Sequence, residues 1–175
     1  MDLKEYIRSI PDYPKKGILF RDITTLIKNE KAFTHCIDQI VDKSKEFKFN
    51  KIAAVESRGF VFASALSYIL KKPFILLRKK NKLPSETHSV DFELEYGTAT
   101  IEVHKDSINK DDSVIVIDDL IATGGTAEAS AKLIKISKGK VAGFIFVINL
   151  FDLEGSNNLI KKGYKVENLI HFPGH

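Results

Sequence analysis

Short apolar runs that alternate with helical stretches constrain the fold of this chain more than any other feature. The run Val114–Ile117 is β-branched throughout and continuous rather than alternating, which is typical of a strand buried on both faces of a parallel sheet. The expected strands are 52–55, 73–77, 114–117, 141–150 and 164–172, and the expected helices are 31–47, 60–70, 127–137 and 156–162. With 175 residues and no linker or repeat, we expect one α/β domain, a mostly parallel twisted sheet flanked by helices.

The pattern changes between residues 79 and 104. Residues 81–89 are polar, whereas 92–96 and 98–103 alternate like two antiparallel strands. This predicts a long mobile loop that ends in a β-ribbon. Loops of this length are usually functional lids or disordered segments, and both interpretations stay open.

The composition excludes several classes of protein. Hydrophobic residues make up 43% and charged residues 29% of the chain, as in globular proteins. The apolar runs are far shorter than the roughly 18 residues that cross a bilayer, and the N-terminus mixes acids with bases, unlike a secretory signal. The single cysteine, Cys36, excludes an internal disulfide and leaves a zinc site without its usual partners. We therefore expect Cys36 in the core, no membrane partner and a cytoplasmic location.

The positive charge is modest and local. The net charge of +4 is small for a nucleic-acid binder, but Arg78, Lys79, Lys80 and Lys82 follow the apolar run 74–77. Such a cluster is usually a solvated face, and at the end of a strand it is also suited to hold polyphosphate. A nucleic-acid patch is a further interpretation, which a steep salt dependence of binding would reveal. We expect no nucleic-acid partner.

The segment after Val114–Ile117 carries the chemistry. It continues with Asp118-Asp119 and then Thr123-Gly124-Gly125-Thr126 before a helix. Ligands of open α/β sheets bind beyond the carboxyl ends of the strands, and a glycine turn at a helix N-terminus offers amides to an anion. Neither a Walker loop nor a dinucleotide fingerprint is present. The loop is therefore predicted to bind phosphate and the two acids to bind sugar hydroxyls, as a phosphorylated ribose requires. A second diacid, Asp111-Asp112, precedes its strand and is interpreted as a solvated turn.

This segment resembles the donor-binding motif of the type I phosphoribosyltransferases. The similarity narrows to the adenine-specific enzymes of that family and extends from about Ile10 to Phe151, through the motifs Gly17–Thr24, Glu56–Phe60, Arg78–Pro84 and Leu94–Gly97. Two departures are Thr25, where proline is common, and Asn81, where glycine is common. The resemblance implies the type I fold, with residues 1–30 as a small purine-binding hood and 79–104 as a flexible catalytic loop and ribbon.

The resemblance implies transfer of ribose 5-phosphate from 5-phosphoribosyl 1-pyrophosphate to N9 of adenine, giving AMP and pyrophosphate. The transition state is oxocarbenium-like, and magnesium is held mainly by the donor and water, with no direct protein ligand. A homodimer is also implied, with Arg58 and its helix near the interface. The peptide between Ser57 and Arg58 is expected to be strained, often cis.

Each part of the substrates has candidate residues. Those for the ribose are Asp118 and Asp119; for the 5-phosphate, Ala122, Thr123, Gly124, Gly125 and Thr126; for the pyrophosphate, Ser57, Arg58, Arg78, Lys79 and Lys82; for adenine, Leu19, Phe20, Arg21 and Leu120. Glu95 is the candidate general acid/base, against the alternative of an ordinary exposed strand residue. Tyr96 would pack beside the pyrophosphate or hydrogen-bond to it. Glu56 is expected to fix local structure.

Other functions share parts of this pattern. A phosphoribosyltransferase for xanthine, hypoxanthine, guanine or orotate would have the same diacid and glycine loop, and residues 19–21 and 95–96 discriminate among them. A regulator that senses the donor is a second class, but only ten residues precede Pro11, too few for a helix-turn-helix. The five histidines do not cluster, so we assign them no metal site.

Overall fold

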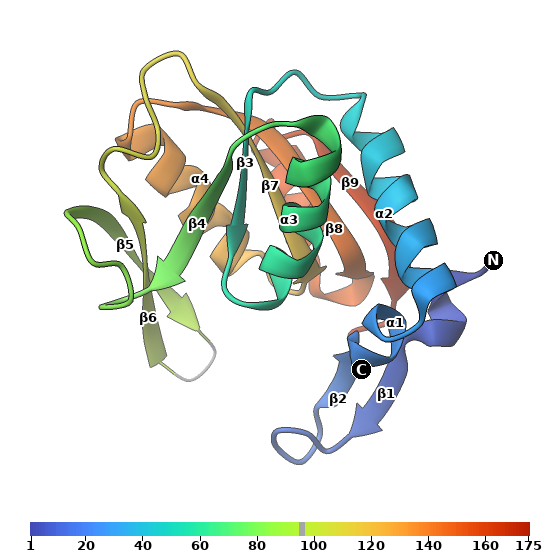
Figure 1. Cartoon of the computed structure of the whole chain (residues 1–175). Coiled ribbons are helices and arrows are strands. Elements are labelled where there is room, and N and C mark those ends of the chain that lie inside the picture. The colour runs from blue at the N-terminus through green and yellow to red at the C-terminus, as the bar shows by residue number, and fades with distance from the viewer. Residues whose placement is uncertain (95–96) are drawn as a thin grey trace.

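The computed structural model describes residues 1–94 and 97–175, which form an α/β fold around a seven-stranded sheet (Figure 1). In spatial order the strands are β5 (Thr87–Leu94), β6 (Gly97–His104), β4 (Phe74–Lys79), β3 (Lys51–Val55), β7 (Ser113–Ile121), β8 (Lys140–Leu150) and β9 (Val166–Phe172). The strands from β4 to β9 in this order are parallel, whereas β5 and β6 form an antiparallel hairpin at one edge. The predicted α/β class with a mostly parallel sheet is confirmed.

Helices cover both faces of the sheet. Figure 1 shows α2 (Glu30–Ser44) and α3 (Arg58–Leu70) on one side and α4 (Gly125–Ile136) on the other, where α5 (Gly155–Lys161) adds Leu159 to the core. Alternate residues of β7 serve the two faces, because Ile115 and Ile117 join the cluster of α2 and α3, whereas Val114 and Val116 join that of α4. This double burial explains why the strand is apolar at successive positions. Within the described residues, no helix is long and apolar enough to cross a membrane.

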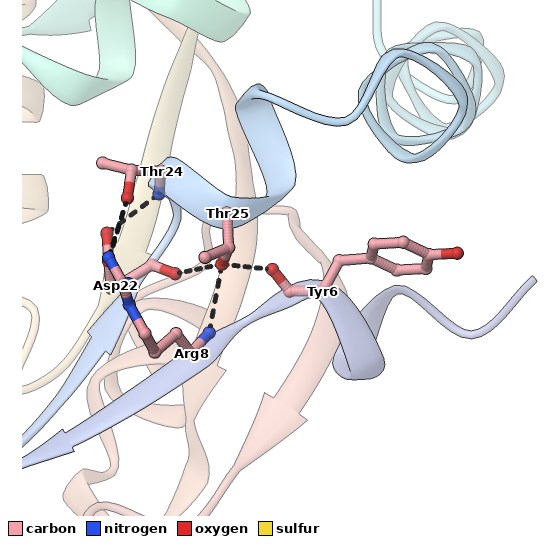
Figure 2. Close-up of polar contacts among 5 residues, drawn as sticks. All are labelled: Tyr6, Arg8, Asp22, Thr24 and Thr25. Atoms are coloured by element: carbon pink, nitrogen blue, oxygen red, sulfur yellow. Dashed lines mark hydrogen bonds and ion pairs between the residues drawn. The ribbon is translucent and has the colours of Figure 1, made fainter.

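A small hood stands apart from the sheet (Figure 1). It consists of the short helix η1 (Leu3–Tyr6), the antiparallel strands β1 (Arg8–Pro11) and β2 (Leu19–Asp22), and α1 (Thr24–Ile27). Figure 2 shows the polar contacts that join these elements. The buried Asp22 carboxylate accepts hydrogen bonds from Arg8 Nε (3.0 Å) and from the Thr24 amide (2.9 Å). These contacts fix the end of β2 that follows the proposed adenine-binding residues.

The polar loop is shorter than expected. Strand β5 begins at Thr87 and pairs with β6 from there, so the loop covers residues 80–86 rather than 81–89. The sequence pattern failed here because β5 is an edge strand, where polar residues remain solvated. Glu102 of β6 holds both ends of the loop, since its carboxylate accepts from the Asn81 amide (2.8 Å) and from Thr87 Oγ1 (2.9 Å).

Two predictions about acidic residues are wrong. Strand β7 does not end at Ile117 but continues through the diacid, with Asp118 opposite Phe146 and Leu120 opposite Ile148 of the longer strand β8. Asp111 lies in an exposed turn as predicted, but Asp112 is not solvated. It is buried and forms an ion pair with Lys51 (2.7 Å), so it joins the start of β7 to β3.

Candidate active site

A cavity of about 650 Å³ lies at the carboxyl ends of β3 and β7. Of the predicted site residues, the cavity is lined by Ser57, Arg58, Lys79, Asp118, Asp119, Leu120, Ala122, Thr123, Gly124, Gly125 and Thr126. Parallel strands place their carboxyl ends at one edge of the sheet, which brings these separate segments together. The structure therefore unites the proposed ribose and phosphate residues with three of the five proposed pyrophosphate residues.

The diacid is held in one arrangement by its neighbours. The Asp119 side chain is 9% exposed and forms an ion pair with Arg58 Nε (2.7 Å), while the Asp119 amide donates to Asp118 Oδ1 (2.8 Å). Gly59 of α3 lies so close that a β-carbon there would be 2.9 Å from Asp118 Oδ1 and 3.1 Å from the Ile117 carbonyl oxygen. Burial, followed by the nearby charge of Asp119, raises the pKa of Asp118 well above its usual value. Such perturbed groups in clefts are candidates for function.

The glycine loop has the backbone geometry that the predicted phosphate site requires, and it lines the cavity. Gly124 has a φ of +93°, a left-handed conformation that glycine adopts without steric cost. It directly precedes α4, whose first amides have no partner within the helix and carry the positive end of its dipole. The loop therefore presents N–H groups to the cavity, as phosphate binding requires.

Gly155 supports this loop and was missed by the sequence analysis. Its amide donates to the Ala122 carbonyl oxygen (3.1 Å), and a β-carbon on it would lie 2.3 Å from that oxygen and 2.8 Å from the Gly124 nitrogen. Both neighbours are backbone, so they cannot rotate away. The only sequence signal was a glycine just before the short helix expected at 156–162.

A Gly155→Ala variant is expected to raise the KM for the phosphoribosyl donor by about tenfold or more, because the methyl group must displace the loop backbone that is predicted to bind phosphate. Steady-state kinetics with each substrate varied in turn would measure this effect, with a smaller change expected for the base. Gly163→Ala is the control, since Gly163 follows the same helix and a β-carbon there would meet nothing within 4 Å; the strain from its φ of +92° falls on that end of the helix and not on the loop. A donor KM equal to that of the control would contradict the supporting role.

The proposed pyrophosphate residues fall into two groups. Ser57 is the N-cap of α3 and makes no capping hydrogen bond with its side chain, and Lys79 ends β4 at the cavity. Arg78 and Lys82 do not line the cavity but pair with Glu56, at 2.7 and 3.3 Å. Burial alone would raise the pKa of Glu56, which is 5% exposed, but its hydrogen bonds to the two cations lower it. Glu56 therefore stays ionised and holds Arg78 at its Nε.

The cis peptide bond that does not precede a proline lies one position earlier than expected. It joins Glu56 to Ser57, whereas the Ser57–Arg58 bond leads into α3, whose first residue is Arg58. The prediction for Ser57–Arg58 is wrong because Arg58 already belongs to the helix.

The adenine residues are divided between the cavity and the hood. Leu120 lines the cavity, whereas Leu19, Phe20 and Arg21 lie on β2 and are not in its lining. The Phe20 ring nevertheless lies 5.4 Å from the Arg58 guanidinium, which does line it. Arg58 thus connects the proposed base-stacking ring to the diacid.

The ribbon contributes a wall that sequence analysis did not assign. Five of its described residues line the cavity: Phe92, Glu93 and Leu94 of β5, and Ala99 and Ile101 of β6. Leu153, in the short helix η2 (Phe151–Leu153), lines the cavity as well. Alternation had indicated the strands but not the face that each residue occupies.

Comparison with known proteins identifies the family of this site. The model of the phosphoribosyl transferase domain matches residues 22–172. The chain belongs to the phosphoribosyltransferase family. It is 78% identical over 175 residues to the adenine phosphoribosyltransferase of Pelagibacter ubique (strain HTCC1062), with 100% of both chains covered. It is 49% identical over 173 residues to that of Escherichia coli O157:H7 (strain EC4115 / EHEC), covering 99% of this chain and 94% of the relative.

Solved structures agree with these relatives. The adenine phosphoribosyltransferase of Thermoanaerobacter pseudethanolicus has a TM-score of 0.93 at 46% identity, covering 97% of this chain and 98% of that one. The Giardia lamblia enzyme, solved as a complex with 9-deazaadenine, has a TM-score of 0.92 at 29% identity, covering 98% and 96%. The predictions of a type I phosphoribosyltransferase fold and of an adenine phosphoribosyltransferase of purine salvage are confirmed.

The two departures from the family pattern have local explanations in this phosphoribosyltransferase. Thr25 Oγ1 donates to the Tyr6 carbonyl oxygen (2.6 Å) and accepts from the Arg8 amide (3.3 Å) (Figure 2), which a proline could not do. Asn81 has a φ of +68°, a conformation that asparagine tolerates better than most residues.

The two proposed catalytic residues, Glu95 and Tyr96, lie outside the described residues. Their flanking residues do not: Leu94 lines the cavity and Gly97 begins β6. The roles of Glu95 and Tyr96 therefore stay predictions.

Proposed function

We propose that the chain transfers the 5-phosphoribosyl group of 5-phosphoribosyl 1-pyrophosphate to N9 of adenine and releases AMP and pyrophosphate. The observation that supports this proposal is that the glycine loop directly follows the β7 strand that carries the diacid. A sugar that donates its hydroxyls to Asp118 and Asp119 would have its 5-phosphate near residues 122–126, because both sets line one cavity. No base-binding argument is needed for this part.

The cavity is suited to the charges of the reaction. As the bond from C1 to pyrophosphate breaks, the sugar becomes positive and the leaving group more negative. In our proposal Arg58, Lys79 and the backbone at Ser57 stabilise the leaving group, and the diacid stays beside the sugar. Arg78 and Lys82, held by Glu56, would add positive charge from outside the cavity lining.

Magnesium would fit this arrangement as an ion bound mainly by the donor and water. The diacid offers oxygen ligands of the kind that Mg²⁺ prefers, but Mg²⁺ needs six and usually takes most of them from water and substrate phosphates. Bound to the pyrophosphate oxygens, the ion would neutralise charge on the leaving group. The described carboxylates that line the cavity are those of Glu56, Glu93, Asp118 and Asp119. We assign the last two to the ribose hydroxyls.

The base is proposed to lie between Phe20 and Leu120, with its Watson–Crick edge against the main chain of Leu19 and Arg21. Strand β2 is paired only with β1 in a two-stranded sheet, so its other edge has backbone groups available. A carbonyl acceptor and an N–H donor there match the 6-amino group and unprotonated N1 of adenine. A 6-oxopurine would oppose both groups, and sites of this kind discriminate by about 10⁴ or more.

Product analysis with the donor, magnesium and a panel of bases tests the function. Adenine is expected to give AMP. The kcat/KM for hypoxanthine and guanine is expected to be about 10⁴-fold lower than that for adenine. Preferred use of xanthine, hypoxanthine, guanine or orotate would replace the base assignment and keep the donor site. Donor binding without transfer to any base would favour the donor-sensing regulator instead.

The remaining expectations stay predictions. A homodimer agrees with the exposed apolar residues Tyr68 and Ile69 of α3 and Leu76 of β4. The mobility expected for residues 81–89 and a cytoplasmic location likewise stay predictions.

A further inference from the structure

The side chain of Arg21 does not line the cavity and contacts the tail segment, which we define as residues 172–175. Its Nη2 donates to the Pro173 carbonyl oxygen (3.3 Å), and its guanidinium lies 4.3 Å from the Phe172 ring centroid. Its Nη1 donates to Ser9 Oγ (2.6 Å) of the neighbouring strand β1. One guanidinium therefore joins both strands of the hood hairpin to the tail segment, near the end of β9 (Figure 1).

The tail segment is attached at a second point, to the cavity wall. The Gly174 amide donates to Asp152 Oδ2 (3.3 Å), and a β-carbon on Gly174 would lie 2.8 Å from Leu153 Cγ. Asp152 and Leu153 belong to η2, and Leu153 lines the cavity. The segment thus spans from the hood to the wall of the proposed active site.

Few other side chains link β2 to the body of the molecule. In the described part of the chain, the aromatic and polar contacts of Leu19–Arg21 with residues beyond the hood are those of Arg21 with the tail segment and of Phe20 with Arg58. The second is a contact with a half-exposed side chain, Arg58, that is itself proposed to bind substrate. Ile23 and Leu26, which follow β2, are buried in the core, but the tail segment is the attachment through the side chains of Leu19–Arg21 that does not depend on a proposed substrate-binding group.

We propose that the tail segment is a strap that positions the hood over the purine end of the cavity, with the Arg21 side chain as its anchor on the hood and Asp152 as its anchor on the wall. This inference rests on the proposed function, because it concerns the gap between Phe20 and Leu120 in which the base is placed. Arg21 acts as a positioning residue through its side chain, separately from its main chain. Arginine is suited to this position because its planar fork can stack on a ring and donate in two directions at once.

The two anchors act in series, which gives a sharp test. Loss of either contact of the tail segment, with Arg21 or with Asp152, would free β2, and loss of both contacts would have no further effect. Arg21→Ala and Asp152→Ala are each expected to raise the KM for adenine by about tenfold and to leave the KM for the donor within about twofold. The double variant is expected to match the more affected single variant rather than the product of the two effects.

Two variants serve as matched controls. Lys4→Ala removes another cation above the Phe172 ring (5.4 Å), but from η1 rather than from β2. Glu154→Ala removes an acid next to η2 that accepts from Asn157 and not from the tail segment. Both are expected to keep the parent KM for adenine.

Hydrogen exchange of the β2 amides provides a readout apart from activity. Exchange at residues 19–22 is expected to increase equally in either single variant and no further in the double variant. Three results would each overturn the strap. The first is a double variant whose effects on KM and exchange equal the product of the single effects. The others are equal increases in KM for adenine and donor, and an unchanged KM for adenine in a folded single variant. Failure of the parent to convert adenine would instead overturn the proposed function.

Discussion

An Asp118→Asn, Asp119→Asn double variant is expected to lose at least about 10³-fold in turnover with adenine while remaining folded. Hydrogen bonds to ionised acceptors are roughly twice as strong as those to neutral ones, and both proposed ribose contacts would become neutral. Replacing Asp119 also removes the ion pair that orients Arg58. Steady-state rates with saturating donor and adenine measure the loss.

A measurement of thermal stability distinguishes this loss of turnover from a loss of the fold. Because burial and the Asp119 charge raise the pKa of Asp118, its ionisation lowers the free energy of unfolding as the pH rises above the unfolded value, about 3.9. Asp118→Asn removes that charge, so at neutral pH the single variant is expected to unfold at no lower temperature than the parent. Asp111→Asn, at an exposed position of left-handed backbone, is the control. Turnover of the double variant within a few-fold of the parent would remove the diacid from the ribose site.

Replacement of Glu95 by Gln or Ala is expected to lower kcat by about 10²- to 10⁴-fold, with a smaller effect on the KM for the donor. This follows if its carboxylate moves a proton at N7 or N9 of the base, a step that comes after donor binding. Single-turnover and steady-state rates with both substrates would measure it.

Glu86, in the polar loop before β5, provides the comparison for Glu95. Its side chain is 84% exposed and lies 3.9 Å from Lys105, so Glu86→Gln is expected to keep the parent kcat. If Glu95→Ala also turned over at the parent rate, Glu95 would be an ordinary strand residue.

The sequence predicted those parts of the site that are contiguous along the chain. The run Val114–Ile117, the diacid and the loop 123–126 follow one another. The strand, the two acids and the glycine loop could therefore be placed without knowledge of tertiary contacts. The continuous apolar pattern also identified the parallel sheet, because burial on two faces has a local signature in composition.

Features that depend on contacts between distant segments were not predictable. Gly155 supports the Ala122 carbonyl from a different element, and nothing in its neighbourhood in the sequence reveals that approach. Asp112 resembled a solvated turn residue until Lys51 of a neighbouring strand was placed beside it. The start of β5 was hidden because an edge strand tolerates polar residues, so its alternation was weak. Arg21 was assigned from its motif, but the direction of its side chain depends on the fold of residues 172–175.

The close approach of Gly59 to Asp118 has a consequence for the thermodynamics of binding. The helix leaves no room for a methyl group beside the carboxylate, and the Asp119 amide holds one of its oxygens. A side chain confined in this way has already lost its rotational entropy when the protein folds. If Asp118 binds the ribose as proposed, donor binding does not have to restrict that side chain again, so more of the hydrogen-bond free energy contributes to affinity. The smallest residue of α3 thus leaves room for the carboxylate, and the Asp119 amide holds it there in the absence of ligand.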